Sequence, residues 1–144
     1  MPLISDFIEL SRPINGFIAF ISVFLGAFIA SRSLVLSIEI LLIAIAALLI
    51  LSAGNAINDY CDYQIDAVNK PNRPIPSGRI RRKHAAVFSI ILMVIGTSLS
   101  FLVNWKAILI ATLVSITLVV YAVWLKRTPL AGNIVVGILT GLTF

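Results

Sequence analysis

The sequence contains few charged residues and almost no cysteine or histidine. Among its 144 residues there are six acidic side chains, one histidine and one cysteine. The lone Cys61 excludes a disulfide within the chain. The net charge of +5 is not carried on a separate polar domain, which a nucleic-acid-binding protein would need for its basic face. We therefore expect no nucleic-acid partner.

Long apolar runs take the place of polar sequence. Hydrophobic residues make up 60% of the chain, whereas soluble domains contain about 45–50%. A bilayer core requires about 20 mostly apolar residues per helix. The chain has four such runs and most of a fifth, at 14–30, 34–57, 85–103, 108–124 and 130–144. These runs predict an all-α, multi-pass transmembrane helical bundle with four full spans and most of a fifth, surrounded by membrane lipids.

The basic residues are concentrated in alternate connections between these runs. The connection at 58–84 carries six lysines and arginines and the one at 125–129 carries two, whereas the other two connections have only Arg32 and Lys106. Strict alternation of spans places both basic connections on one side, and the positive-inside rule makes that side cytoplasmic. We therefore expect a cell-membrane protein whose N-terminus is cytoplasmic.

Half of the acidic residues lie in one segment at the end of the second run. Residues 55–66 read N-A-I-N-D-Y-C-D-Y-Q-I-D. On a continuous helix the polar residues of this segment fall within an arc of roughly 100°: Asn55, Asn58, Asp59, Asp62 and Asp66. Carboxylates about 6 Å apart repel by ~3 kcal/mol per pair at an effective dielectric near 20. Such a face needs a cation, and we predict a divalent metal there.

The connection after this acidic face is rich in proline and basic residues. Residues 68–82 read V-N-K-P-N-R-P-I-P-S-G-R-I-R-R. Three prolines exclude a helix and favour a semi-rigid loop. Lys70, Arg73 and Arg79 could then bind a diphosphate, whose oxygens are shared between metal ions and basic side chains. The alternative is a loop that meets anionic lipid headgroups, which we favour for the basic residues at 81–83.

These motifs resemble the first aspartate-rich signature of the UbiA-type intramembrane prenyltransferase superfamily. The pattern N-x-x-x-D-x-x-x-D is matched by Asn58, Asp62 and Asp66, and Asp59 is an additional acid. The string N-K-P-N-R-P-I-P-S-G follows, as in the family. Within the family, the pattern N-D-Y-x-D-Y-x-I-D is most similar to the sequences of archaeal members that build ether lipids.

Three shorter matches extend the resemblance along the chain. Arg12-Pro13 with Asn15 resembles the family's R-P-x-N at the start of the first span. Tyr121 and Lys126 resemble its Y-x-x-x-x-K. Gly132-Asn133 resembles the G-N pair that follows.

The resemblance implies Mg²⁺-dependent transfer of a prenyl group from an isoprenoid diphosphate. Metal ions and basic side chains stabilise the leaving diphosphate, so that the C1–O bond breaks and an acceptor captures the allylic cation. The resemblance implies that Asp62 and Asp66 hold the metal, with Asn58 as a neutral ligand or orienting amide and Asp59 as an outer or further ligand. We expect the donor to be bound by Asn15, Lys70, Arg73, Tyr121 and Lys126. Asn55 either joins this set or cross-links helices.

The acceptor and two other classes of protein remain open. Geranylgeranyl diphosphate is the expected donor, and the basic excess favours the hydroxyl of a glyceryl phosphate lipid as acceptor. An aromatic acceptor such as 4-hydroxybenzoate or a quinone precursor is the alternative. A cation transporter would place its acids near the bilayer midplane on broken helices. A CDP-alcohol phosphotransferase would need a D-G-x-x-A-R segment, which this sequence lacks.

The acids are absent from the second half of the chain. The family has a second aspartate motif in its C-terminal half, whereas no acid follows Asp66 here. We therefore expect residues 1–144 to be the N-terminal part of a single intramembrane prenyltransferase domain, inactive by itself.

Overall fold

The computed structural model describes residues 3–33, 36–128, 134, 137–138 and 141. Within these residues every regular element is a helix. The elements are α1 (Ile4–Ser11), α2 (Pro13–Ser31), α3 (Ile38–Cys61), α4 (Tyr63–Asn69), α5 (Arg82–Phe101), α6 (Trp105–Val123) and the 3₁₀ turn η1 (Leu125–Arg127).

Four of these helices, α2, α3, α5 and α6, are long and apolar enough to cross a membrane. The prediction of an all-α multi-pass bundle is therefore confirmed for its first four spans. The predicted fifth run at 130–144 and the Gly132-Asn133 pair lie outside the described residues, apart from four isolated positions of the run.

Polar residues set where two of the spans begin. The side chain of Ser37 accepts a hydrogen bond from the backbone N–H of Ile40, and this cap begins α3. The side chain of Asn104 accepts from the N–H of Ala107 at 2.9 Å. This cap begins α6 at Trp105, three residues before the apolar run that predicted it.

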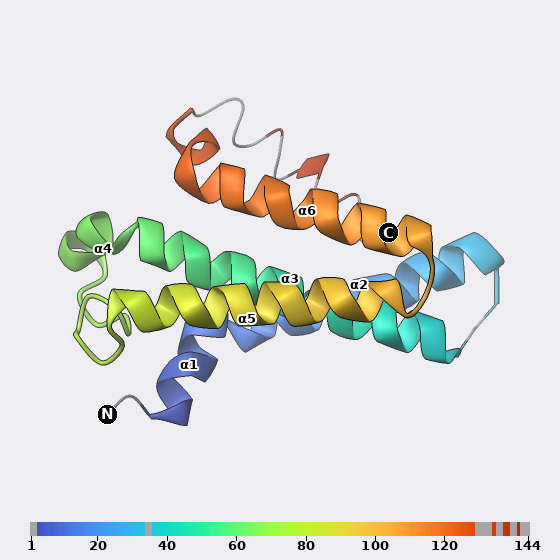
Figure 1. Cartoon of the computed structure of the whole chain (residues 1–144), viewed down its shortest axis with the longest axis horizontal. Helices are drawn as coiled ribbons and strands as arrows, with labels where there is room; N and C mark the ends of the chain where they lie inside the picture. Colours follow the sequence, from blue (N-terminus) through green and yellow to red (C-terminus); the bar gives the residue numbers. More distant parts are fainter. Residues whose placement is uncertain (1–2, 34–35, 129–133, 135–136, 139–140, 142–144) are drawn as a thin grey trace.

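The bundle is built around α3, which packs against α2, α5 and α6 (Figure 1). The buried positions of α3 are mostly small, which lets its neighbours approach its backbone closely. Ser89 of α5 donates a hydrogen bond to the carbonyl oxygen of Ala53 at 2.8 Å. A Cβ on Gly96 of α5 would lie 2.8 Å from Cγ1 of Ile50 and 3.1 Å from the carbonyl oxygen of Ala46. Only glycine allows this contact between α5 and α3.

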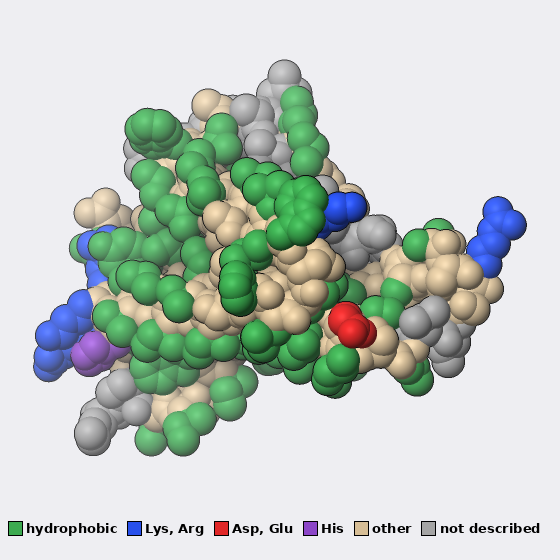
Figure 2. Space-filling model, turned by 45° about the vertical axis from the view of Figure 1, so that its right-hand side comes forward, with side chains coloured by type: hydrophobic (Ala, Val, Ile, Leu, Met, Phe, Trp, Pro, Cys, Tyr) green, Lys and Arg blue, Asp and Glu red, His purple; other side chains and the backbone are tan. Residues whose placement is uncertain are grey.

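The outer faces of the spans are apolar. Large side chains such as Phe17, Ile90 and Leu113 are about half exposed or more. Figure 2 shows hydrophobic side chains over the flank of the bundle, with a group of basic side chains and the histidine at one end and other basic side chains toward the opposite end. This distribution suits a helix bundle surrounded by lipid.

Both predicted basic connections lie at the same end of the bundle. Lys126, just after α6, contacts Asp62, just after α3. Figure 1 places α1, α4, the loop before α5 and the C-terminal end of α6 at this end. We call it the polar end. The alternation of spans inferred from the charge pattern is therefore correct.

The contact at Gly96 predicts a stability effect. We expect Gly96→Ala to lower the free energy of unfolding by about 1–3 kcal/mol, because the new methyl group collides with a backbone oxygen. In the matched control, Gly54→Ala, the added Cβ meets only the side chain of Leu118 at 3.1 Å. Thermal unfolding of the full-length protein in detergent tests this, and equal midpoints for the two variants would contradict it.

Candidate active site

The helix that carries the acidic segment is interrupted at Asp62. Helix α3 ends at Cys61 and α4 begins at Tyr63, and Asp62 between them has φ −89° and ψ 5°. The N–H of Asp62 still bonds to the carbonyl of Asn58 at 2.9 Å, so the interruption is a local distortion. The prediction of one continuous helical face over residues 55–66 is therefore wrong at this point, and the acidic side chains form two groups.

The first group is a buried ion cluster around Arg73. Its carboxylates, Asp59 and Asp66, are only 4% and 5% exposed. Nη1 of Arg73 lies 2.6 Å from Oδ2 of Asp66 and 3.2 Å from Oδ1 of Asp59. Nη2 of Arg12 lies 2.6 Å from the same oxygen of Asp59. Since breaking such a buried pair leaves an uncompensated charge, Arg73 holds its loop firmly against α3 and α4.

The second group joins Asn58 and Asp62 to the cation that follows α6. Nζ of Lys126 lies 2.5 Å from Oδ1 of Asp62 and 3.4 Å from Oδ1 of Asn58. Both members of the ion pair are partly buried, with side chains 16% and 21% exposed. The 3₁₀ turn η1 brings Lys126 back over the end of α3.

The chain itself supplies counter-charges for its acids. Three carboxylates of the polar end meet Arg12, Arg73 and Lys126. Repulsion between the carboxylates is therefore relieved by ion pairs, and does not by itself require a metal as the sequence argument assumed.

The donor set nevertheless suits a magnesium site that a substrate completes. Among the described residues no three Asp, Glu, His or Cys side chains converge on one point. Magnesium is commonly held by one or two carboxylates together with waters and substrate phosphates. Oδ1 of Asn58 and Oδ1 of Asp62 both contact Nζ of Lys126, so the two oxygens are close enough to bind one cation. Asp66, the third predicted ligand, belongs to the Arg73 cluster.

Arg12 is a site residue that the sequence reasoning did not select. It has φ 52° and ψ 69°, a left-handed conformation that turns the chain between α1 and α2 and lets its guanidinium reach Asp59. Nδ2 of Asn55 donates to the carbonyl of Ser11 at 3.1 Å and fixes the same junction. The R-P-x-N match was the signal that could have identified Arg12.

The remaining basic loop residues have different surroundings. Arg79 donates to Asp6 at 2.6 Å, to Glu9 at 2.7 Å and to the carbonyl of Asn72 at 2.7 Å. It therefore joins the loop to α1, away from the predicted diphosphate. The spacing of Asp6 and Glu9 on one side of a helical turn was the signal for this contact. Lys70 is exposed at the end of α4.

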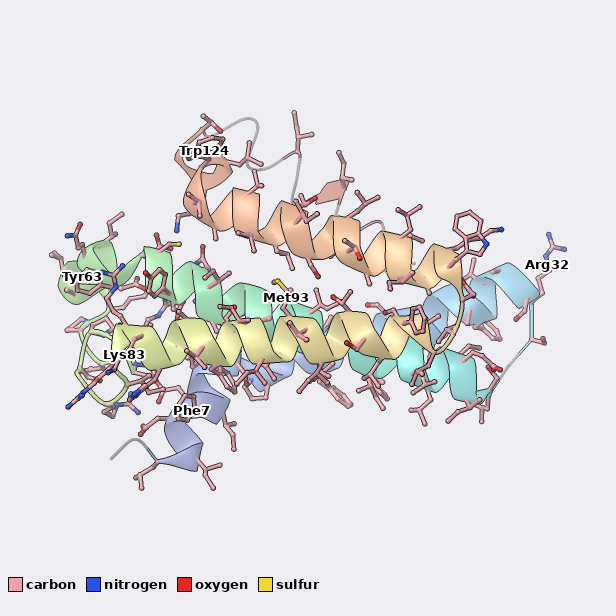
Figure 3. The ribbon with its side chains drawn as sticks, viewed as in Figure 1. Phe7, Arg32, Tyr63, Lys83, Met93 and Trp124 are labelled. Atoms are coloured by element: carbon pink, nitrogen blue, oxygen red, sulfur yellow. The ribbon has the colours of Figure 1, made fainter. Side chains whose placement is uncertain are left out.

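Arg82 forms an aromatic contact at the interruption. Its guanidinium carbon lies 4.5 Å from the ring centroid of Tyr60 and 4.1 Å from that of Tyr63. Its Nη2 also donates to the carbonyl of Tyr60 at 3.2 Å. Figure 3 labels Tyr63 on the α4 side and Lys83 at the start of α5. Arg82 therefore packs on Tyr60 and Tyr63, close to Asp62 on either side, and its exposed position leaves the predicted contact with lipid headgroups a prediction.

A cavity of about 720 Å³ lies between α2, α3 and α6. Its polar lining includes Arg12, Asn15, Asn55, Asn58 and Tyr121. The structure thus brings Asn15 and Tyr121, which are 106 positions apart in the sequence, to the same cavity as Asn58. The rest of the lining is mainly aliphatic and continues along the spans to residues near their other ends, such as Ile43 and Ala107.

Comparison with known proteins identifies relatives. The sequence model of the UbiA prenyltransferase family matches residues 19–144. Digeranylgeranylglyceryl phosphate synthase of Methanosphaera stadtmanae is 41% identical over 140 residues, which cover 97% of this chain and 50% of that protein. The synthase of the same name from Methanococcoides burtonii is 44% identical over 146 residues, with coverages of 96% and 52%.

A solved structure has the same fold. It comes from a study of "Structural and mechanistic insights into the biosynthesis of Digeranylgeranylglyceryl phosphate synthase in membranes". It matches with a TM-score of 0.92 and 36% identity, over 96% of this chain and 50% of that one. The chain spans about half the length of the curated relatives it matches.

The Arg82 contact predicts that a positive charge alone at this position does not maintain the wild-type free energy of unfolding. We expect Arg82→Lys to lower the free energy of unfolding by about 1–2 kcal/mol, because lysine cannot lie flat on two rings while donating to Tyr60. The matched control is Arg81→Lys at the exposed neighbouring position, which should unfold like the wild type. Thermal unfolding tests this, and a stable Arg82→Lys variant would support the lipid-headgroup role instead.

The contact between Arg79 and α1 predicts a dependence on pH. The backbone N–H of Leu3, and then Arg79, hold the pKa of Asp6 below its ordinary 3.8. Hydrogen bonds from Arg79 to Glu9 and Asp6 raise the pKa of the guanidinium, which stays charged. A lowered carboxylate pKa stabilises the fold above about pH 4, and this contribution is lost as the pH falls through the folded-state value.

We therefore expect α1 amides to be protected from hydrogen exchange at pH 6 and to lose protection below about pH 4. Asp6→Asn should weaken this dependence on pH, because the amide does not titrate, while Arg79 keeps its contact with the carboxylate of Glu9. Exchange measured by mass spectrometry, corrected for the intrinsic effect of pH, tests this. Protection of α1 that stays constant down to pH 3 would contradict it.

Proposed function

Because this chain belongs to the UbiA prenyltransferase family, we propose that its protein transfers a prenyl group from an isoprenoid diphosphate to an acceptor at the membrane surface. The observation that supports this most is the cavity between α2, α3 and α6. It combines a long aliphatic wall with polar residues beside the acidic cluster, as a donor with an apolar tail and a charged head requires.

The length of the cavity is consistent with a geranylgeranyl donor. From Asn58 to Ile43, both of which line the cavity, α3 rises about 22 Å at 1.5 Å per residue. An extended chain of four isoprene units spans about 20 Å if its sixteen bonds each advance about 1.25 Å. The tail would lie along α3, with the diphosphate near Arg12, Asn15 and Asn58.

Magnesium is the metal that we propose for this site, with Asn58 and Asp62 as its protein ligands and Asp66 joining them if Arg73 releases it. When bound, the metal would draw charge from the breaking C1–O bond onto the diphosphate. Asp59, held between Arg12 and Arg73, would position these two guanidinium groups beside the diphosphate.

Other residues of the chain would stabilise the separated charges. Lys126, Arg73 and the exposed Lys70 would neutralise phosphate oxygens. The ring of Tyr121 lines the cavity beside the proposed diphosphate position, where its face could stabilise the allylic cation. Aliphatic walls would keep water from the cation until the acceptor attacks. Asn55, which cross-links α3 to the α1–α2 junction, also lines the cavity and would contact the donor.

We propose a glyceryl phosphate lipid as acceptor, as in archaeal ether-lipid synthesis. The names of the two relatives support this assignment over an aromatic acceptor such as 4-hydroxybenzoate. We further propose that the protein lies in the cell membrane with its polar end in the cytoplasm, since both basic connections lie there. A cation transporter is disfavoured, because Asp59, Asp62 and Asp66 cluster at one end of the bundle.

A product assay with the full-length protein tests the proposal. With geranylgeranyl diphosphate and Mg²⁺, geranylgeranylglyceryl phosphate should be prenylated and 4-hydroxybenzoate should not. EDTA should stop turnover, and Mg²⁺ should restore it. Prenylation of the aromatic acceptor alone would contradict the lipid assignment.

Variants of the acidic residues test the roles of the site. Asp62→Asn and Asp66→Asn should each lower kcat by about a hundredfold or more, as loss of several kcal/mol of charge stabilisation requires. The matched control is Glu39→Gln, which removes a carboxylate from the other end of the same helix and should leave kcat unchanged. Wild-type turnover in Asp62→Asn would refute the proposed metal site.

A further inference from the structure

The ammonium of Lys126 lies where a metal ligated by Asn58 and Asp62 would have to lie. It contacts Oδ1 of Asp62 at 2.5 Å and Oδ1 of Asn58 at 3.4 Å. We infer that Lys126 competes with the metal for these two oxygens, so that metal binding depends on the diphosphate. This inference rests on the proposed function, because it concerns the same site.

The two cations exclude each other for electrostatic reasons. A divalent ion and an ammonium cannot both contact the same carboxylate oxygen without strong repulsion. To bind between Asn58 and Asp62, a metal must displace Lys126 from a partly buried ion pair. The displaced ammonium then needs another anionic partner, since an uncompensated charge in this environment is costly.

A diphosphate would provide that partner. Asn58 contacts Lys126 and also lines the cavity, so a diphosphate at the polar lining lies next to the lysine. Lysine has a flexible four-carbon stem and a compact charge, so it can exchange one oxygen for another by rotation of its side chain. Displacement of Lys126 therefore costs less free energy when the metal binds together with diphosphate than when the metal binds alone.

The other basic residues of the polar end are less able to exchange. Arg73 bridges Asp59 and Asp66, and Arg12 is held on Asp59 at 2.6 Å. Moving Arg73 would remove a cation from two nearly buried carboxylates, whereas moving Lys126 would remove one only from the partly buried Asp62. Lys126 is thus the cation whose movement links metal and diphosphate binding. By linkage, each ligand should then strengthen the binding of the other.

Binding of Mn²⁺ to the full-length protein in detergent, followed by electron paramagnetic resonance, tests the inference. The titration is done with Mn²⁺ alone and with added inorganic pyrophosphate, after correction for their complex in solution. We expect Lys126→Met to bind Mn²⁺ alone at least fivefold more tightly than the wild type. Pyrophosphate should then improve Mn²⁺ affinity less in this variant than in the wild type.

Three further variants make the result specific. Lys126→Gln should behave like Lys126→Met, and provides a second measurement should the methionine variant not fold. Lys106→Met removes an exposed lysine from the opposite end of α6 and should bind Mn²⁺ like the wild type. Asp62→Asn should abolish the Mn²⁺ site, which identifies the measured ion as the one at Asp62.

Equal or weaker Mn²⁺ binding in both Lys126 variants would overturn the inference, as would Mn²⁺ binding that does not depend on Asp62. The prenyl-transfer assay separates this outcome from failure of the proposed function. Normal product formation by the wild-type protein, together with a Mn²⁺ affinity that is unchanged in the Lys126 variants, would refute only the competition between Lys126 and the metal. Tighter Mn²⁺ binding in the Lys126 variants, together with no prenylated product from the wild-type protein, would refute only the proposed reaction.

Discussion

The polar end of this protein depends on Arg73, which binds two nearly buried carboxylates at once. Through Asp59 and Asp66 it connects the proline-rich loop to both sides of the interruption at Asp62. A buried carboxylate without a partner is strongly unfavourable, so these ion pairs restrict the loop to one position. The same requirement places Arg12 on Asp59, at the α1–α2 junction. Four separate segments are thereby brought together where the reacting groups would lie.

The packing of α3 also shapes the cavity that reaches the polar end. Small residues on α3 and Gly96 on α5 allow the helices to approach closely, so α3 is held firmly on the α5 side. On the side facing α2 and α6 the packing leaves an apolar cavity that reaches the polar end. A rigid wall on one side and an open cavity on the other suit the proposed function, in which a long isoprenoid tail is held while its diphosphate reacts.

Charge balance at the polar end supports the proposal that the substrate and the metal bind together. The carboxylates already have partners on the chain, namely Arg12, Arg73 and Lys126. A metal alone must displace one of these cations, whereas a metal with diphosphate brings the anion that the displaced cation needs. The ion pairs also leave the polar end without excess negative charge, which would be costly next to the hydrocarbon region.

The sequence alone determined the four spans, their alternation and the segment that carries the acids, because length, hydropathy and charge are local properties of the chain. It also identified Asn15, Asn58 and Tyr121, which the fold brings to one cavity. Only the tertiary structure decided which cation meets which acid. Arg79 pairs with Asp6 of α1, Arg82 stacks on Tyr60 and Tyr63, and Asp66 pairs with Arg73 whereas Asp62 pairs with Lys126. Such pairings depend on contacts between segments distant in sequence, where several arginines and lysines of equal charge could serve and only the packing of the helices selects among them.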